Sequence, residues 1–199
     1  MADLKGKKVT YPVGGVSQLY WLIAARDAKL KPGEVDEVKL PIADGRAAFT
    51  SGAVDAMVGQ RRTFLPFLRD GSAVIMADSK GAAPEYRVTM VRSGFLDDKA
   101  QAAAVADFYE RIVQSKKWLV KHYPEAAAIY QRDANVIPED AMAGVREMPA
   151  TVLPLDSDFA AKVQEQSKIF FKAGVIPTNP KFSILLNPRY TTKTGAAPE

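Results

Sequence analysis

Residues 3–59 constrain the fold most strongly, because a short strand there runs through a glycine turn straight into a helix. The pattern predicts a strand at Lys8–Tyr11, which Pro12 ends. From Val16 on, apolar residues recur at the helical spacing i, i+3, i+4 and i+7, which predicts a helix to about residue 29. A turn of this kind aims backbone N–H groups at whatever lies in front of the helix, so it predicts a site for a small anion.

The alternation of strands and helices continues beyond this first helix. Asp44 is the candidate N-cap of the next helix, and Gly52 is the candidate stop. The order β-α-β-α-β-α-β is typical of a sheet with parallel strands and helices on its faces, so we predict an α/β fold. Further strands are predicted at 35–40, 54–58 and 73–77, and short helices at 44–51 and 61–69.

The character of the sequence changes after residues 80–84, where helices become dominant. A strand is predicted at 86–92, and Gly174 is predicted to end the last long helix. We expect an α/β ligand-binding lobe over 1–92 and a helical part of another lobe over 93–199. The helices carry apolar faces that must be buried against the first lobe, each other or a partner. These helices are predicted at 98–121, 124–132, 138–147 and 156–172, and their apolar side chains are Phe108, Trp118, Ile129, Tyr130, Phe170 and Phe171.

The composition excludes several classes of protein. The chain has 199 residues, no cysteine and one histidine, so disulfides, cysteine-ligated metals and thiol chemistry are excluded. Its net charge of +4 is scattered rather than clustered, which argues against nucleic-acid binding. No apolar run reaches membrane-spanning length, and the basic start MADLKGKK lacks the apolar core of a signal peptide.

The sequence also lacks the motifs of common enzymes. It contains no Gly-x-Ser-x-Gly elbow, no phosphate-binding loop and no HExxH motif. A nucleophile such as Ser17 would have only His122 as a histidine base, and His122 is far away in the sequence. We therefore predict a non-catalytic protein that uses no metal and no cofactor.

Four segments carry a resemblance to a known family. They are DLKGKKV at 3–9, LPIADGRAAFTSGAVDAMV at 40–58, HYPEAAAIY at 122–130, and FFKAGVIP…NPRY between 170 and 190. In order and spacing, they resemble the bacterial ABC-transporter solute-binding proteins of the sulfonate/nitrate/taurine type, which have the periplasmic binding protein type II fold. The resemblance covers nearly the whole chain.

This resemblance implies two α/β lobes that close on a small ligand in the cleft between them. The segment that begins at Asp3 would start the second lobe, and the later helices would help to complete the first. The chain would then lack the N-terminal half of lobe one and the export signal. The resemblance further implies a periplasmic location and an ABC permease of the inner membrane as the partner.

The turn after the first strand is the main candidate site. It comprises Gly14, Gly15, Val16, Ser17 and Gln18, and the family places ligand contacts at this turn. Backbone donors, the positive end of the helix and the Ser17 hydroxyl would hold a sulfonate, nitrate or carboxylate. The alternative is a plain strand-to-helix connection, in which glycine only relieves backbone strain.

A second candidate turn contains Gln60 and Arg61, which follow the strand predicted at 54–58. Ligands of open α/β sheets bind beyond the carboxyl ends of the strands, and a guanidinium group there suits an anion. The alternative is a solvated loop.

These observations lead to one functional hypothesis and two alternatives. We expect the non-catalytic, solute-binding component of an ABC import system for a small anionic solute, held at a helix N-terminus. The first alternative is a cytoplasmic ligand-sensing module of the same fold. The second is an incomplete fragment that folds only as an oligomer, burying its helical faces against a second copy.

Overall fold

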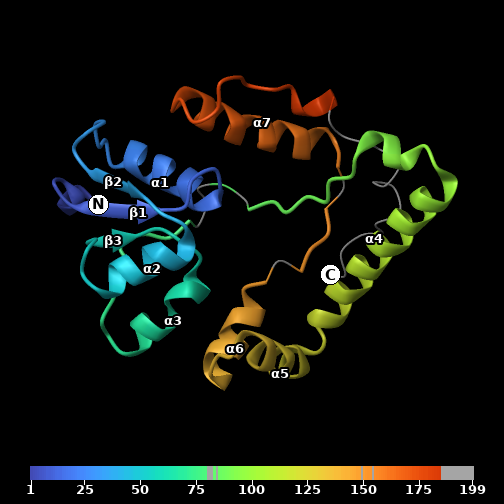
Figure 1. Ribbon diagram of the computed structural model, residues 1–199, viewed down its shortest axis with the longest axis horizontal. Coiled ribbons are helices and arrows are strands. Elements are labelled where there is room, and N and C mark those ends of the chain that lie inside the picture. The colour runs from blue at the N-terminus through green and yellow to red at the C-terminus, as the bar shows by residue number, and fades with distance from the viewer. Residues whose placement is uncertain (80–82, 84, 149, 154, 185–199) are drawn as a thin grey trace. The chain divides into compact units, whose positions relative to one another are not determined.

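The computed structural model describes residues 1–79, 83, 85–148, 150–153 and 155–184 (Figure 1). The chain divides into two compact units. Unit 1 comprises Met1–Glu85 and Lys162–Lys181, and unit 2 comprises Tyr86–Ala161 and the residues from Phe182 on. The division into lobes at 92/93 stays a prediction, as does the role of 185–190, the end of the closing segment of resemblance, which lies outside the described residues.

A sheet of three parallel strands forms the centre of unit 1. The strands are β1 (Lys8–Tyr11), β2 (Asp36–Lys39) and β3 (Ala56–Met57), and their order is β2-β1-β3. All three lie within the ranges that the sequence predicted. A parallel neighbour on each side and buried faces explain why β1 has little alternation, since Val9, Thr10 and Tyr11 are all buried.

Helices cover both faces of β1. Helix α1 (Val16–Asp27) packs on the face to which Tyr11 points, where the rings of Tyr11 and Trp21 stack with centroids 6.2 Å apart. The opposite face carries Thr10, against which α2 packs through Gly45. The apolar core on the α1 side contains Leu4, Val9, Tyr11, Trp21 and Val35.

Helix α2 (Ile42–Thr50) begins earlier than predicted. Its N-cap is Pro41, and Asp44 lies in the first turn, so the predicted N-cap is wrong. A carboxylate in the first turn still interacts favourably with the helix dipole, which is why the sequence signal was displaced by a few residues. The predicted stop is confirmed, because Gly52 follows the helix with a φ of 74°.

Helix α3 (Arg61–Arg69) has the predicted bounds, and it runs on through Pro66. The strand predicted at 73–77 is wrong, since the segment forms no ladder and its Val74 side chain is 81% exposed. The strand predicted at 86–92 is wrong for the same reason, and Met90 is 87% exposed. A continuous apolar run at 73–77 and alternating side chains at 86–92 favour strands. A strand needs a partner for its backbone groups, however, and neither segment has one among the described residues.

Unit 2 is built from helices at the predicted places. They are α4 (Lys99–Leu119), α5 (Tyr123–Ala134), α6 (Pro138–Arg146) and the first part of α7 (Ser157–Lys172). Short 3-10 turns lie at Ser93–Leu96 and Phe182–Ile184 in unit 2, and another lies at Ala2–Leu4 in unit 1. Helices α5 and α6 share a core of Leu119, Ala126, Ala127, Ala141 and Val145.

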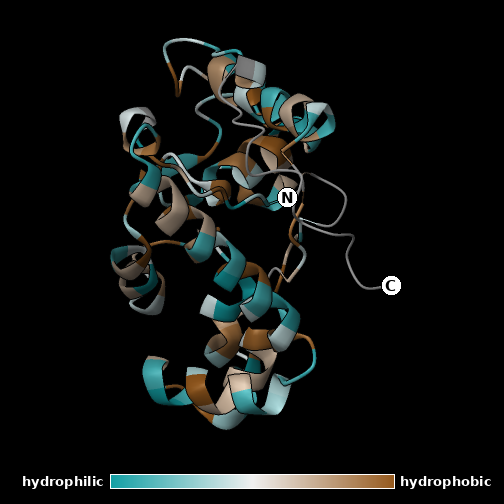
Figure 2. Ribbon diagram, turned by 90° about the vertical axis from the view of Figure 1, so that its right-hand side faces the viewer, coloured by the Kyte–Doolittle hydropathy of each residue, from teal (hydrophilic) through white to brown (hydrophobic). Residues whose placement is uncertain are grey.

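The remaining apolar faces of the helices stay partly open. Hydrophobic and hydrophilic residues are interleaved along the helices in Figure 2, and Phe108 is 56% exposed. The prediction that these faces require a cover is therefore still open for these side chains. Within the described residues, no helix is long and apolar enough to cross a membrane. Of the apolar side chains predicted to need a cover, those that are exposed are Phe108, Trp118, Ile129 and Phe171.

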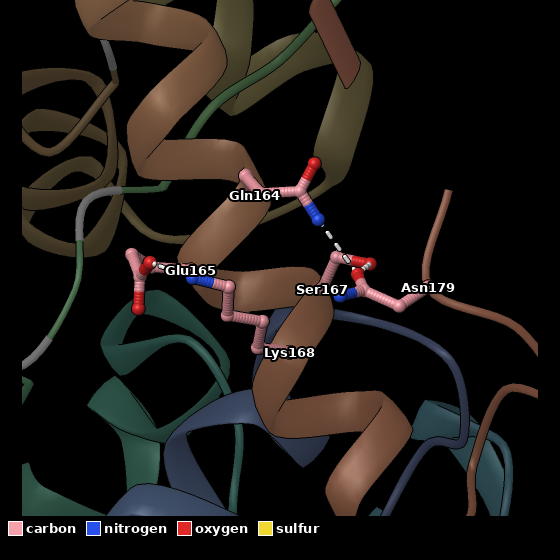
Figure 3. Close-up of polar contacts among 5 residues, drawn as sticks. All are labelled: Gln164, Glu165, Ser167, Lys168 and Asn179. Atoms are coloured by element: carbon pink, nitrogen blue, oxygen red, sulfur yellow. Dashed lines mark hydrogen bonds and ion pairs between the residues drawn. The ribbon is translucent and has the colours of Figure 1, made fainter. Parts of the chain in front are cut away.

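The second segment of unit 1 contains the end of α7 and the loop behind it. Gly174, with a φ of 69°, follows the helix as predicted. The Oδ1 atom of Asn179 accepts hydrogen bonds from Gln164 Nε2 at 2.7 Å and from Ser167 Oγ at 2.8 Å (Figure 3). These two bonds hold the loop against the helix.

Candidate functional site

Three helices of unit 1 begin at the same edge of the sheet. Helices α1, α2 and α3 start at Val16, Ile42 and Arg61, and each follows a strand of the parallel sheet. Because the carboxyl ends of parallel strands lie at one edge, the three connecting loops meet there. This edge therefore carries the partial positive charge of three helix N-termini.

The first candidate turn has a shape that presents donors. Gly14 has a φ of 78°, a conformation that glycine adopts without strain, and Gly15 is the extended N-cap residue of α1 with no side-chain cap. Among the described residues, no acceptor is found for the backbone N–H groups of Gly15, Val16 and Ser17. These amides are the donors that an anion would require.

Ser17 adds a hydroxyl to these amides. The residue is only 7% exposed, and its Oγ atom has no hydrogen-bond partner in the described part of the chain. The Ser17 residue is mostly buried, but its Oγ atom is not among the fully buried oxygens that lack a partner. The hydroxyl is therefore accessible, and it can form a hydrogen bond with a ligand.

Gln18 makes a hydrogen bond within the turn. Its Oε1 atom accepts a hydrogen bond of 2.7 Å from the backbone N–H of Gly14, so this donor is occupied by the protein itself. In a capping box, a glutamine at the third helical position reaches back to the N-cap N–H. Here the bond goes to Gly14, one residue before the N-cap residue Gly15. In this structure Gln18 shapes the turn.

A carboxylate fixes the neighbouring end of β1. Glu37 on β2 accepts hydrogen bonds from the Tyr11 hydroxyl and, at 3.0 Å, from Trp21 Nε1. Burial and then the Glu37 carboxylate raise the pKa of Tyr11 well above its usual value, while a hydrogen bond from Gln18 opposes the rise. The cluster ties β1, β2 and α1 together beside the turn, and sequence reasoning missed it.

The second candidate turn also has an internal partner. Gln60 is the N-cap residue of α3, and its Nε2 atom donates to Glu85 Oε1 at 3.0 Å. Arg61 is the exposed first residue of the helix. The structure thus places both candidate turns at one edge of the sheet, and whether their residues contact a ligand stays a prediction.

The chain beyond α3 returns to this edge. The Tyr20 hydroxyl of α1 donates to the carbonyl of Ala83 at 3.0 Å, two residues before Glu85. Burial raises the pKa of Tyr20, a hydrogen bond with Ser79 lowers it, and the negative charge of Glu85 raises it. Sequence reasoning gave Glu85 no role, and the sequence offers no local signal for it.

Two other polar side chains contact aromatic rings. The Arg46 guanidinium lies 5.6 Å from the centre of the Phe67 ring, beside a shallow groove of about 430 Å³ along α2. The His122 ring stacks on Trp118, and its Nδ1 atom lies 2.8 Å from the Trp118 carbonyl oxygen. No group of acidic and histidine side chains that could hold a metal ion occurs among the described residues.

Comparisons with known proteins agree with the fold. No protein-family model matches the chain. The chain is 25% identical over 189 residues to an aliphatic sulfonates-binding protein of Escherichia coli (strain K12). This match covers 89% of this chain and 55% of that protein. The periplasmic aliphatic sulphonate binding protein SsuA from Escherichia coli has a solved structure with a TM-score of 0.77 and 22% identity. That match covers 92% of this chain and 59% of SsuA.

A second solved structure gives the same result. The alkanesulfonate-binding protein SsuA from Xanthomonas axonopodis pv. citri, bound to MOPS, matches with a TM-score of 0.78 and 20% identity, over 92% of this chain and 63% of that one. The chain thus spans between about half and two thirds of the length of these relatives. The resemblance and the fold class predicted from the sequence are confirmed: the chain is similar to the aliphatic sulfonate-binding proteins over part of their length, and it has the fold of periplasmic binding proteins.

Proposed function

We propose that this chain is the non-catalytic, solute-binding part of an ABC import system for a small anionic solute of the sulfonate class. The observation that carries the proposal is the first turn of α1. It combines the N–H groups of Gly15, Val16 and Ser17 with the accessible hydroxyl of Ser17, and none of these groups has a partner in the described chain. Oxygen atoms of a sulfonate accept hydrogen bonds from such donors, and the helix dipole adds to the attraction.

The relatives support this choice of ligand. Both Escherichia coli matches are named for aliphatic sulfonates, and the Xanthomonas structure holds MOPS, which is itself a sulfonate. Periplasmic location and an inner-membrane permease as partner belong to the same proposal. A binding role needs no reacting group, and the turn presents only donors that hold and orient an anion.

Isothermal titration with ethanesulfonate, MOPS and nitrate tests the proposal. We expect binding of the sulfonates, and we expect Ser17→Ala to weaken it about tenfold or more, because a hydrogen bond to a charged group contributes roughly 1.5–3 kcal/mol. Ser115→Ala is the matched control, since Ser115 bonds the carbonyl of Ile112 on α4 in unit 2. The control variant should bind like the native chain.

Two results would count against the proposal. If none of the anions binds at millimolar concentration, the chain has no functioning anion site. If a sulfonate binds but Ser17→Ala and Ser115→Ala behave alike, the anion does not lie at the first turn of α1. A melting-temperature shift that rises with ligand concentration gives an independent reading, because a ligand that binds only the native state stabilises it by mass action.

A further inference from the structure

A negative side chain lies at the edge of the sheet where the anion is proposed to bind. Glu85 is partly buried, and its Oε1 atom lies 3.0 Å from Nε2 of Gln60, the N-cap residue of α3. Three helix N-termini meet at this edge, so a carboxylate that approaches one of them is itself favoured there. The same carboxylate makes the edge less favourable for any second anion.

Glu85 also acts on α1, the helix that carries the proposed site. The Tyr20 hydroxyl on the second turn of α1 holds the carbonyl of Ala83, which brings the Glu85 segment against this helix. The charge of Glu85 contributes to the raised pKa of Tyr20, so its field reaches α1 as well as α3. Glu85 therefore lies beside the helix whose first turn is the proposed site.

We propose that Glu85 determines the specificity of the site and selects singly charged over doubly charged anions. The inference rests on the proposed function, because it concerns a ligand at the first turn of α1. The amides of the turn attract an anion of any charge. The repulsion from Glu85 grows in proportion to the charge of the ligand, so it is twice as large for sulfate as for an alkanesulfonate. Sulfate and an alkanesulfonate both present sulfur-bound oxygen atoms, and they differ in the alkyl group and in the charge. Of these two differences, the charge is the one to which Glu85 responds.

This proportionality gives a quantitative test with Glu85→Gln. The variant keeps a side-chain oxygen that can accept from Gln60 Nε2 but removes the charge. Because Glu85 is partly exposed, its field is screened, and the loss of one charge should raise ethanesulfonate affinity roughly three- to tenfold. Sulfate affinity should rise by the square of that factor, about ten- to a hundredfold, so the ratio of the two affinities shifts toward sulfate.

Asp27→Asn is the matched control. Asp27 is the last residue of α1, and Val16 is the first, so their backbones lie about 16 Å apart along the helix at 1.5 Å per residue. Asp27→Asn removes one negative charge, so it changes the net charge of the chain by the same amount as Glu85→Gln. At physiological salt this distance exceeds the screening length, so the ratio of affinities should stay unchanged.

Titration calorimetry of the native chain and of the two variants with ethanesulfonate and sulfate decides the matter. A structural role for Glu85 would change both affinities by one common factor, which would overturn the inference and leave the proposed function intact. If ethanesulfonate binds none of the chains, the proposed function itself fails. Glu85→Ala guards against misfolding of the first variant, because the ratio depends only on the lost charge and should shift equally in both.

Discussion

Two glycines inside helices should respond in opposite directions to the same substitution. Gly45 lies in α2, where it faces β1, and Gly144 lies in α6, where it faces α5. Replacement by alanine should improve the helix at both positions by about 0.5–1 kcal/mol, because glycine loses more backbone entropy on folding. The difference must therefore come from what the new methyl group meets.

At Gly45 the added Cβ atom meets its neighbours at ordinary distances. It would lie 3.4 Å from the Cγ2 and Oγ1 atoms of Thr10 and 3.5 Å from the Met57 methyl group. The helix gain is then nearly undiminished. We expect Gly45→Ala to stabilise unit 1 by about 0.5–1 kcal/mol, a two- to fivefold change in the unfolding equilibrium.

At Gly144 the added Cβ atom would lie only 2.8 Å from Cε1 of the Tyr130 ring. The ring must move away, and its contacts between α5 and α6 are disturbed. Overpacking of this kind costs about 1–3 kcal/mol, which outweighs the helix gain. We expect Gly144→Ala to destabilise the α5–α6 pair by about 1 kcal/mol or more.

Hydrogen exchange followed by mass spectrometry measures the two effects separately, because peptides from α2 and from α5 report on different units. Protection in α2 should rise in Gly45→Ala, and protection in α5 and α6 should fall in Gly144→Ala. If both substitutions raise protection, helix propensity alone governs the two sites, and the packing distances have no predictive value. If both lower it, α2 does not tolerate the methyl group next to β1.

Three further predictions concern single side chains. Thr10→Val should stabilise unit 1 by about 1 kcal/mol in urea unfolding, because Thr10 Oγ1 is buried without a hydrogen-bond partner in the described chain. A loss of stability would show that the hydroxyl has a partner after all. Because the pKa of Tyr11 is raised in the folded chain, the unfolded chain releases this proton at a lower pH. The free energy of unfolding should therefore decrease as the pH rises above about 10, and in Tyr11→Phe it should decrease less steeply over that range. Asp98→Ala should destabilise α4 by about 1 kcal/mol, since the Asp98 carboxylate accepts a hydrogen bond from the Gln101 N–H at 2.9 Å. Circular dichroism measures the loss of helix, and an unchanged signal would mean that this N-cap contributes nothing to stability.

The elements predicted from local periodicity agree with the structure, because both the signal and its cause lie within a few residues. Helix α4 shows this well: Asp98 caps it, and the apolar spacing marks its length. Segments 73–77 and 86–92 show the opposite case. The first is a continuous apolar run and the second alternates, and both patterns favour a strand. A strand exists only where another strand accepts its backbone hydrogen bonds, and the pattern along one segment holds no information about that partner.

The candidate site divides in the same way. The strand, turn and helix around Gly14 were predictable, since each follows from a local rule. Gln18 was assigned to the ligand although its position in the first helical turn favours the local bond to Gly14 that the structure contains. The partners Glu37 and Glu85 could not be found from sequence, because they lie 26 residues from Tyr11 and 25 residues from Gln60 along the chain.

The fold and the ligand specificity of such a site have different physical origins. A strand, a turn and a helix N-terminus produce unpaired amides in any parallel sheet. A likeness at 20–25% identity therefore indicates the same backbone arrangement, but it does not indicate which anion is preferred. Preferences require groups that treat two anions differently. In the described part of unit 1, Ser17 supplies a directional partner, which distinguishes oxygen acceptors by geometry. Glu85 supplies a charge, which distinguishes them by valence, and a relative with a neutral side chain at this place should therefore tolerate sulfate better than this chain does.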